Sequence, residues 1–180
     1  MASTVALNYA EAIFLLGEEE NKLELYLNQL KEINETLKDN NELLSVMLHP
    51  KVSQMDKKAL LDKIFSDKDV AIINFLKVLI DKRRFKYTEE IVSEFINRYN
   101  EYNNIQIATV YSAKKLDEKE LNGILEVLEK RTKAKIEIKN IVDKSLIAGI
   151  KVKINDEVID NSIARKLERL KYQVKSSSIK

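Results

Sequence analysis

The sequence contains no cysteine, a single proline and three glycines among its 180 residues. Without cysteine the chain forms no disulfide and no thiolate metal site, and nothing in it argues for an oxidising compartment. The scarcity of glycine and proline leaves little material for loops, which favours long helices joined by short turns. The composition therefore predicts a helix-rich chain.

The sequence also has no excess of charge of one sign and no long hydrophobic run. Its 31 basic and 29 acidic residues give a net charge of +2, too even for a general binder of nucleic acid or of membrane surfaces. No stretch approaches the roughly 20 apolar residues that span a bilayer, and the first residues lack the basic start of a signal peptide. We expect a soluble cytoplasmic protein that is held at a membrane, if at all, by other chains.

The residues that are present suit a globular protein of one compact domain or two small ones. Hydrophobic residues make up 44% of the chain and charged residues 33%. Up to about residue 104 the apolar residues recur at helical spacing. This pattern predicts about six helices, and hence a helical bundle.

Several residues mark the expected ends of these helices. Ser3 or Thr4 can cap the first helix, and Gly17 is a candidate for its end. Ser53 and Asp56 form a capping pair for the helix after Pro50. The segment 69–84 is apolar around much of its circumference, so we expect it to be the most buried helix. One apolar face is expected on the second helix, formed by Leu23, Tyr26, Leu27, Leu30, Ile33 and Leu37.

After residue 104 the period changes from helical to alternating. Residues 105–113, 135–143 and 145–154 read as strands, with a helix over 116–131 between the first two. Asn155 and Asp156 favour a tight turn into a short strand over 157–160, and Asn161 or Ser162 is expected to cap a last helix. The predicted fold class is therefore mainly α: a six-helix bundle over residues 1–104, followed by a small α+β domain over residues 105–180.

No constellation of catalytic residues stands out. The only histidine, His49, precedes Pro50 at a helix end, where contacts with helix carbonyls are the usual role. The glycines at 17, 123 and 149 are isolated, so no phosphate-binding loop is expected, and no pair of histidines has zinc spacing. We predict no enzyme activity, no catalytic residues, no metal site and no cofactor.

A basic segment at Lys82–Lys86, with Phe85 among the cations, is the one feature that suggests nucleic acid. The alternative is a solvated helix connection whose cations suit the end of the preceding helix. We favour this alternative because nothing extends the patch, so no nucleic-acid partner is expected.

Apolar helical surface is in excess for so small a bundle. The first helix and residues 74–80 both have wide apolar faces. Such faces can form the core, or they can leave a groove for an amphipathic helix from a partner. The spacing alone leaves both readings open.

Four motifs resemble one family in the same order. "NYAEAIFLLG" (8–17), "LHPKVSQMDKKALLDKIF" (48–65), "NFLKVLIDKRRF" (74–85) and "VDKSLIAGIKVKINDEVIDNSIARKLERL" (142–170) are similar to the delta subunit family of bacterial F-type ATP synthases. The mitochondrial oligomycin sensitivity-conferring protein is the counterpart of this subunit. The chain departs from the family pattern at Asn8, where arginine is common, and at Ala148, where the family often has the first of two glycines.

The resemblance implies a non-catalytic stator subunit at the cytoplasmic face of the cell membrane, peripheral to it. The N-terminal bundle would hold the N-terminal helix of an alpha subunit between its first and fifth helices. The C-terminal domain would bind the C-terminal region of the b subunits in the peripheral stalk, so that rotation is coupled to ATP synthesis. A charged residue at Ala12 or Leu79 is then expected to weaken attachment without unfolding the chain. By position, the alpha-binding residues are Tyr9, Ala12, Ile13, Leu16, Leu76, Lys77, Val78 and Leu79.

Overall fold

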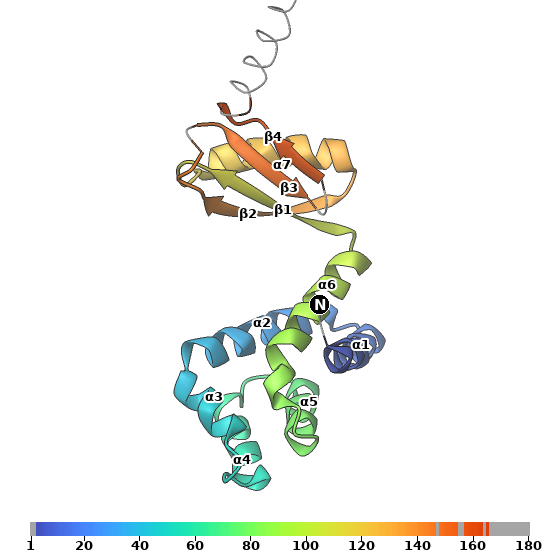
Figure 1. Ribbon diagram of the computed structural model, residues 1–180. Helices are drawn as coiled ribbons and strands as arrows, with labels where there is room; N and C mark the ends of the chain where they lie inside the picture. The colour runs from blue at the N-terminus through green and yellow to red at the C-terminus, as the bar shows by residue number, and fades with distance from the viewer. Residues whose placement is uncertain (1–2, 147, 155–156, 164, 166–180) are drawn as a thin grey trace, which may run out of the picture. The chain divides into compact units, whose positions relative to one another are not determined.

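The computed structural model of the protein describes residues 3–146, 148–154, 157–163 and 165 (Figure 1). The chain divides into two compact units, Met1–Asn100 and Glu101–Lys180. Helices alone make up the first unit, and a sheet with a helix makes up the second. The predicted fold class, a helical part followed by an α+β part, is confirmed.

The N-terminal unit consists of six α-helices and one short 3₁₀ turn. Three of the helices begin at a side-chain cap: the backbone N–H of Ala6 donates to Ser3 Oγ, that of Asp56 to Ser53 Oγ, and that of Ala71 to Asp69 Oδ1. The predicted caps at Ser3 and Ser53 are confirmed. The elements are α1 (Thr4–Glu19), α2 (Leu23–Asp39), α3 (Asn41–Leu48), α4 (Gln54–Ile64), α5 (Val70–Asp81), η1 (Phe85–Tyr87) and α6 (Thr88–Tyr102).

One hydrophobic core holds these helices together. Each of α1, α2, α5 and α6 contributes large buried side chains, and the rings of Phe14 and Phe95 lie 5.9 Å apart between α1 and α6. The predicted face of α2 is confirmed, with Leu23 partly buried at its start. The buried residues of that face are Tyr26, Leu27, Leu30, Ile33 and Leu37.

One prediction about the helix ends is wrong, whereas the predicted burial of α5 is observed. Gly17 does not end α1, which continues to Glu19. A Cβ at Gly17 would lie 2.9 Å from Cδ2 of the buried Tyr26, so the glycine permits close packing of α2 rather than a helix end. Only four of the twelve residues of α5 are exposed, a smaller share than in any other of the six helices, so the prediction that it is the most buried helix is confirmed.

The C-terminal unit is a four-stranded sheet with α7 across one face (Figure 1). The strand order is β2-β1-β3-β4; β1 pairs in parallel with β2 and antiparallel with β3, and β4 is antiparallel to β3. A parallel β1–β2 pair needs a crossover, and α7 supplies it. The elements are β1 (Ile105–Ser112), α7 (Glu118–Thr132), β2 (Lys135–Val142), β3 (Ile150–Ile154) and β4 (Glu157–Asp160).

The third predicted strand is shorter than expected, because the chain turns at Gly149. Strand β3 begins only at Ile150, and Gly149 has φ +91°. A Cβ there would lie 2.7 Å from the carbonyl oxygen of Asn161, so only glycine fits this close approach. Ala148 has no positive φ, which explains why alanine is acceptable there.

The expected cap at Ser162 is supported by its Oγ, which accepts the backbone N–H of Arg165 at 3.3 Å. Most of the last predicted helix, and the predicted turn at residues 155–156, lie outside the described residues.

Candidate partner-binding faces

No group of three or more His, Cys, Asp or Glu residues among the described positions could hold a metal ion. His49 Nδ1 accepts the backbone N–H of Lys51 at 3.2 Å, so the predicted contact of its ring with helix carbonyls is not the one observed. No helix in the described ranges is long and apolar enough to cross a membrane. The candidate functional sites are therefore accessible surfaces that could bind partner chains.

Three of the eight predicted alpha-binding residues lie in the core. Ile13 is 2% exposed, and Leu76 and Leu79 are fully buried. In this conformation their side chains are not accessible to a partner, and their role is to hold α1 and α5 in the bundle. The expectation that a charge at Leu79 leaves the fold intact has to be corrected, because an unpaired charge in a core destabilises a protein strongly.

Lys77 also lies away from the α1 side of α5. Its Nζ forms an ion pair with Asp62 Oδ1 of α4 at 2.7 Å. Lys77 therefore supports the contact between α4 and α5, rather than a surface between α1 and α5.

The other four predicted residues are accessible and lie with two more that the sequence reasoning missed. Ala12 and Val78 are exposed, and Tyr9 and Leu16 are partly buried against the core. The missed residues, Ala71 and Phe75, are likewise partly buried and precede Val78 by seven and three positions, on one side of α5. We call this set the α1–α5 face; it consists of Tyr9, Ala12, Leu16, Ala71, Phe75 and Val78.

Aromatic contacts join the two helices of the α1–α5 face. The rings of Tyr9 and Phe75 lie 6.2 Å apart at an interplanar angle of 63°, an edge-to-face arrangement. The guanidinium of Arg84 lies 5.3 Å from the centre of the Tyr9 ring, and its Nη1 donates to the Tyr9 hydroxyl at 3.3 Å. The face is thus apolar along its middle, with a cation beside Tyr9.

The basic segment does not have the arrangement that stacks on bases. Phe85 is only 4% exposed and belongs to the core, while Arg84 lies against Tyr9. Because binding of single-stranded nucleic acid depends on accessible aromatic rings, the burial of Phe85 removes the feature that suggested nucleic acid.

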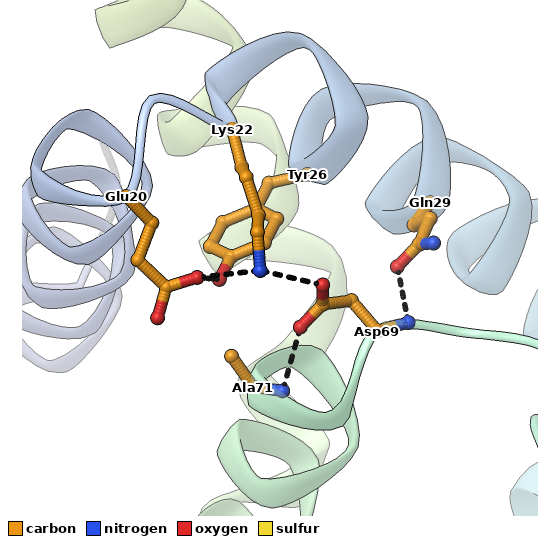
Figure 2. Close-up of polar contacts among 6 residues, drawn as sticks. All are labelled: Glu20, Lys22, Tyr26, Gln29, Asp69 and Ala71. Carbon is orange, nitrogen blue, oxygen red and sulfur yellow. Dashed lines mark hydrogen bonds and ion pairs between the residues drawn. The ribbon is translucent and has the colours of Figure 1, made fainter.

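A polar network fixes the start of α5 relative to the turn between α1 and α2 (Figure 2). Lys22 Nζ lies 2.9 Å from Glu20 and 3.0 Å from Asp69, whose backbone N–H donates to Gln29 Oε1 at 2.9 Å. The hydroxyl of the buried Tyr26 donates to Glu20 at 2.8 Å. These contacts tie the N-terminus of α5 to α2, and so help to set where α5 lies beside α1.

The charges in this network stabilise one another. The backbone N–H of Ala71, and then the ammonium of Lys22, hold the pKa of Asp69 below its usual value. Hydrogen bonds from Lys22 and Tyr26 lower the pKa of Glu20, and Glu20 and Asp69 together raise that of Lys22. Burial, and then the hydrogen bond to Glu20, raise the pKa of Tyr26.

The C-terminal unit has an apolar concave surface of its own. A cavity of about 490 Å³ lies between α7 and the strands β3 and β4. At its edge Val127 is 65% exposed. We call this the α7–sheet face; its apolar lining residues include Leu116, Ile124, Val127, Ile150 and Ile159.

Comparison with known proteins gives consistent matches over nearly the whole chain. The family model of the ATP synthase delta (OSCP) subunit matches residues 5–174. "ATP synthase subunit delta" from Clostridium perfringens is 40% identical over 164 residues, covering 91% of this chain and 92% of its own length. The protein of the same description from Bacillus cytotoxicus is 37% identical over 171 residues, covering 94% and 95%. A chain in the cryo-EM structure of the Toxoplasma gondii mitochondrial ATP synthase hexamer has a TM-score of 0.72 at 20% identity, covering 96% of this chain and 98% of its own, which shows a shared fold.

Proposed function

The chain belongs to the ATP synthase delta (OSCP) subunit family, and we propose that its two units connect two different parts of that enzyme. It is a non-catalytic stator subunit of an F-type ATP synthase. Its N-terminal unit binds the N-terminal helix of an alpha subunit through the α1–α5 face. Its C-terminal unit binds the C-terminal region of the b subunits, and the subunit is thereby held at the cytoplasmic face of the membrane.

The observation that carries this proposal is the family match over residues 5–174, which includes both units. A stator link needs a binding surface at each end and no reaction of its own. Rotation of the central shaft applies torque to the catalytic head, and the head turns with the shaft unless it is tied to the membrane sector. Each unit has an accessible apolar surface, the α1–α5 face on one and the α7–sheet face on the other.

The α1–α5 face suits an amphipathic helix. Its apolar side chains recur every three or four residues along α1 and along α5, so they form a row on each helix. The apolar face of an amphipathic helix from a partner can pack between two such rows. Burial of apolar surface contributes roughly 25 cal/mol per Å², from which the cost of association is subtracted. Arg84, beside Tyr9, favours an acidic residue on the bound helix at that point.

The α7–sheet face is the corresponding candidate for the b subunits. It is concave and lined mostly by apolar side chains, with Glu120 and Arg131 among its polar members. An apolar surface with a polar edge is the usual composition of a protein interface.

A test of the whole proposal uses membranes from which this subunit has been removed. Without it, ATP hydrolysis should continue while ATP-driven ion pumping is lost, and adding the full chain back should restore pumping. Pull-down from detergent-solubilised membranes should recover alpha and b subunits with the tagged chain. If pumping is unchanged without the subunit, the stator assignment is wrong.

A test of the alpha-binding face compares two valines of α5. Val78→Asp places a charge in the α1–α5 face, whereas Val70→Asp places it at the exposed first turn of the same helix, where an acid is favourable. We expect Val78→Asp to weaken binding of a synthetic alpha N-terminal peptide about tenfold, since a buried unpaired charge costs more than about 1 kcal/mol. Ala12→Asp should act in the same direction. Equal affinities for the Val78 and Val70 variants, in calorimetric titrations, would remove the α1–α5 face as the binding site.

A further inference from the structure

The N-terminal unit has a cavity that contains none of the residues of the α1–α5 face. It has a volume of about 540 Å³ and lies among α3, the start of α4, the end of α5 and the η1 turn. Met47, Ile80 and Phe85 line it, and each of them is less than 5% exposed. Their depth gives the cavity an apolar floor, and its size is within the range of small-molecule sites.

The charged residues that line this cavity are all cations. They are Lys57, Arg83 and Lys86, and no Asp or Glu is among the lining residues. No ion pair is found for these three cations within the described ranges; the ammonium of Lys57 donates to the neutral carbonyl of His49 at 2.8 Å. In a chain with a net charge of only +2, three such cations around one cavity form a local positive field.

Three carboxylates close to these residues in the chain are engaged with other groups. Asp56 accepts the hydroxyl of Ser53 at 2.7 Å in the first turn of α4. Asp81 accepts the ammonium of Lys58 at 2.7 Å, and Glu90, whose charge interacts with that of Lys86, accepts the backbone N–H of Ser3 at 3.2 Å. None of the three carboxylates lines the cavity.

We propose that this cavity binds an amphiphilic carboxylate: a single anionic head with an apolar chain or ring. The head would lie among Lys57, Arg83 and Lys86, and the apolar part would lie against Leu48, Pro50 and Val52, next to the buried floor. A neutral apolar molecule leaves the three cations without an anionic partner, and a compact inorganic anion leaves the apolar lining residues Leu48, Pro50 and Val52 uncovered, of which Leu48 is 45% exposed. A ligand with both properties satisfies both parts of the cavity. The site is independent of the stator role, since none of its residues belongs to the α1–α5 face.

The test uses three probes of equal chain length on the full chain. Decanoate, 1-decanol and decyltrimethylammonium are titrated calorimetrically, with NMR shifts recorded for the amides of residues 46–57 and 80–86. Decanoate should bind tightest, 1-decanol more weakly and the cation not measurably. Binding of decanoate should weaken as salt is raised, because the cations are near the surface. Equal binding of all three probes, or NMR shifts confined to other residues, would overturn the proposal.

Matched variants test the residues. Arg83→Gln with Lys86→Gln should weaken decanoate binding roughly fivefold, whereas Lys82→Gln with Lys51→Gln, which removes two cations outside the cavity, should not. Leu48 lines the cavity and is 45% exposed, whereas Val46 on the same helix is 40% exposed and does not line it. Leu48→Glu should therefore abolish binding and Val46→Glu should leave it, with both variants folded by circular dichroism.

Two further results would assign the cavity to another ligand class and so contradict the proposal. One is that the protein sediments with phosphatidylglycerol vesicles only when Lys57, Arg83 and Lys86 are present, although it does not bind decanoate. The other is binding of an acidic, leucine-containing peptide to these residues when decanoate does not bind.

Discussion

Gly17 and Gly123 both lie inside helices, yet their surroundings are opposite. A Cβ at Gly17 would meet Tyr26 Cδ2 at 2.9 Å and Leu23 Cδ2 at 3.1 Å, whereas one at Gly123 has nothing within 4 Å. Tyr26 is fully buried and its hydroxyl donates to Glu20, so its ring has little freedom to move away. The same residue type is therefore a packing requirement in α1 and a local weakness in α7.

These surroundings predict opposite signs for the same substitution. Gly123→Ala should stabilise the C-terminal unit by roughly 0.5–1 kcal/mol, because alanine loses less backbone entropy in a helix. Gly17→Ala gains the same propensity but must displace the Tyr26 ring, so we expect a net loss of about 1 kcal/mol. Urea unfolding followed by circular dichroism measures both. A stabilised Gly17→Ala protein would show that α2 can shift without loss.

Asp69 has two functions at one position, because it caps α5 and pairs with Lys22. Asp69→Asn keeps an acceptor for the cap and removes the ion pair, so the free energy of unfolding should fall by about 1 kcal/mol at neutral pH. Glu18→Gln, on an exposed residue outside the network of Figure 2, is the control and should change it by less than about 0.5 kcal/mol.

The pH dependence of stability reports what the charge of Asp69 contributes, through the cap with Ala71 and the ion pair with Lys22 together. The pKa of Asp69 is lower in the folded chain than its ordinary value of 3.8, so its stabilising contribution is complete above that value and is lost as pH falls through the folded pKa. The side-chain amide of the Asp69→Asn variant does not titrate. Unfolding free energies measured between about pH 5 and pH 2 should therefore fall less steeply for Asp69→Asn than for the natural chain. Parallel curves would show that Asp69 adds nothing through its charge.

At the scale of elements, α5 explains both what could be predicted and what could not. It has two apolar stripes, Ile72, Leu76 and Leu79 on one and Ala71, Phe75 and Val78 on the other, both at helical spacing. The sequence identifies α5 as apolar but gives no means of choosing which stripe is buried, and the predicted alpha-binding set took residues from both. By contrast, α2 has a single stripe, and its buried face was predicted correctly.

The two stripes predict different results for neighbouring substitutions. Leu79→Asp places a charge at a fully buried position. It should prevent the N-terminal unit from folding, because the free-energy cost of burying an unpaired charge exceeds the few kcal/mol by which a domain of this size is stable. Val78→Asp, at a side chain that is 43% exposed, should leave the thermal midpoint within a few degrees of the natural chain. A folded Leu79→Asp protein by circular dichroism would mean that the stripe assignment is inverted.

For the strands too, the sequence predicts what neighbouring residues determine, and it does not predict what contacts with distant residues determine. Alternation correctly predicted β1, β2 and the second half of the third strand, β3, whose Val152 and Ile154 lie in the core. It placed the start of β3 too early, because the approach of Asn161 to Gly149 depends on a segment about twelve residues later. Phe85 is likewise flanked by cations in the sequence, which gives no sign that its side chain belongs to the core.

At the scale of the whole molecule, a link between two partners requires that each end keeps its structure under load. The two units have separate hydrophobic cores: one is formed by the helices α1 to α6, and the other by α7 with the sheet. No described residue belongs to both cores. Each unit therefore has its own source of stability, and a change at one binding face need not alter the other.

This separation predicts that a fragment of residues 1–104 folds alone and binds the alpha N-terminal peptide with the affinity of the full chain. All residues of the α1–α5 face and of its core lie within the fragment, and it ends after α6, before β1 begins. Helical circular dichroism with a cooperative thermal transition, and equal dissociation constants for fragment and full chain, are the expected results. The fragment carrying Val78→Asp is the control for specific binding. An unfolded fragment would contradict the independence of the N-terminal unit. A folded fragment that binds at least about tenfold more weakly would show that the C-terminal unit supplies part of the alpha-binding site.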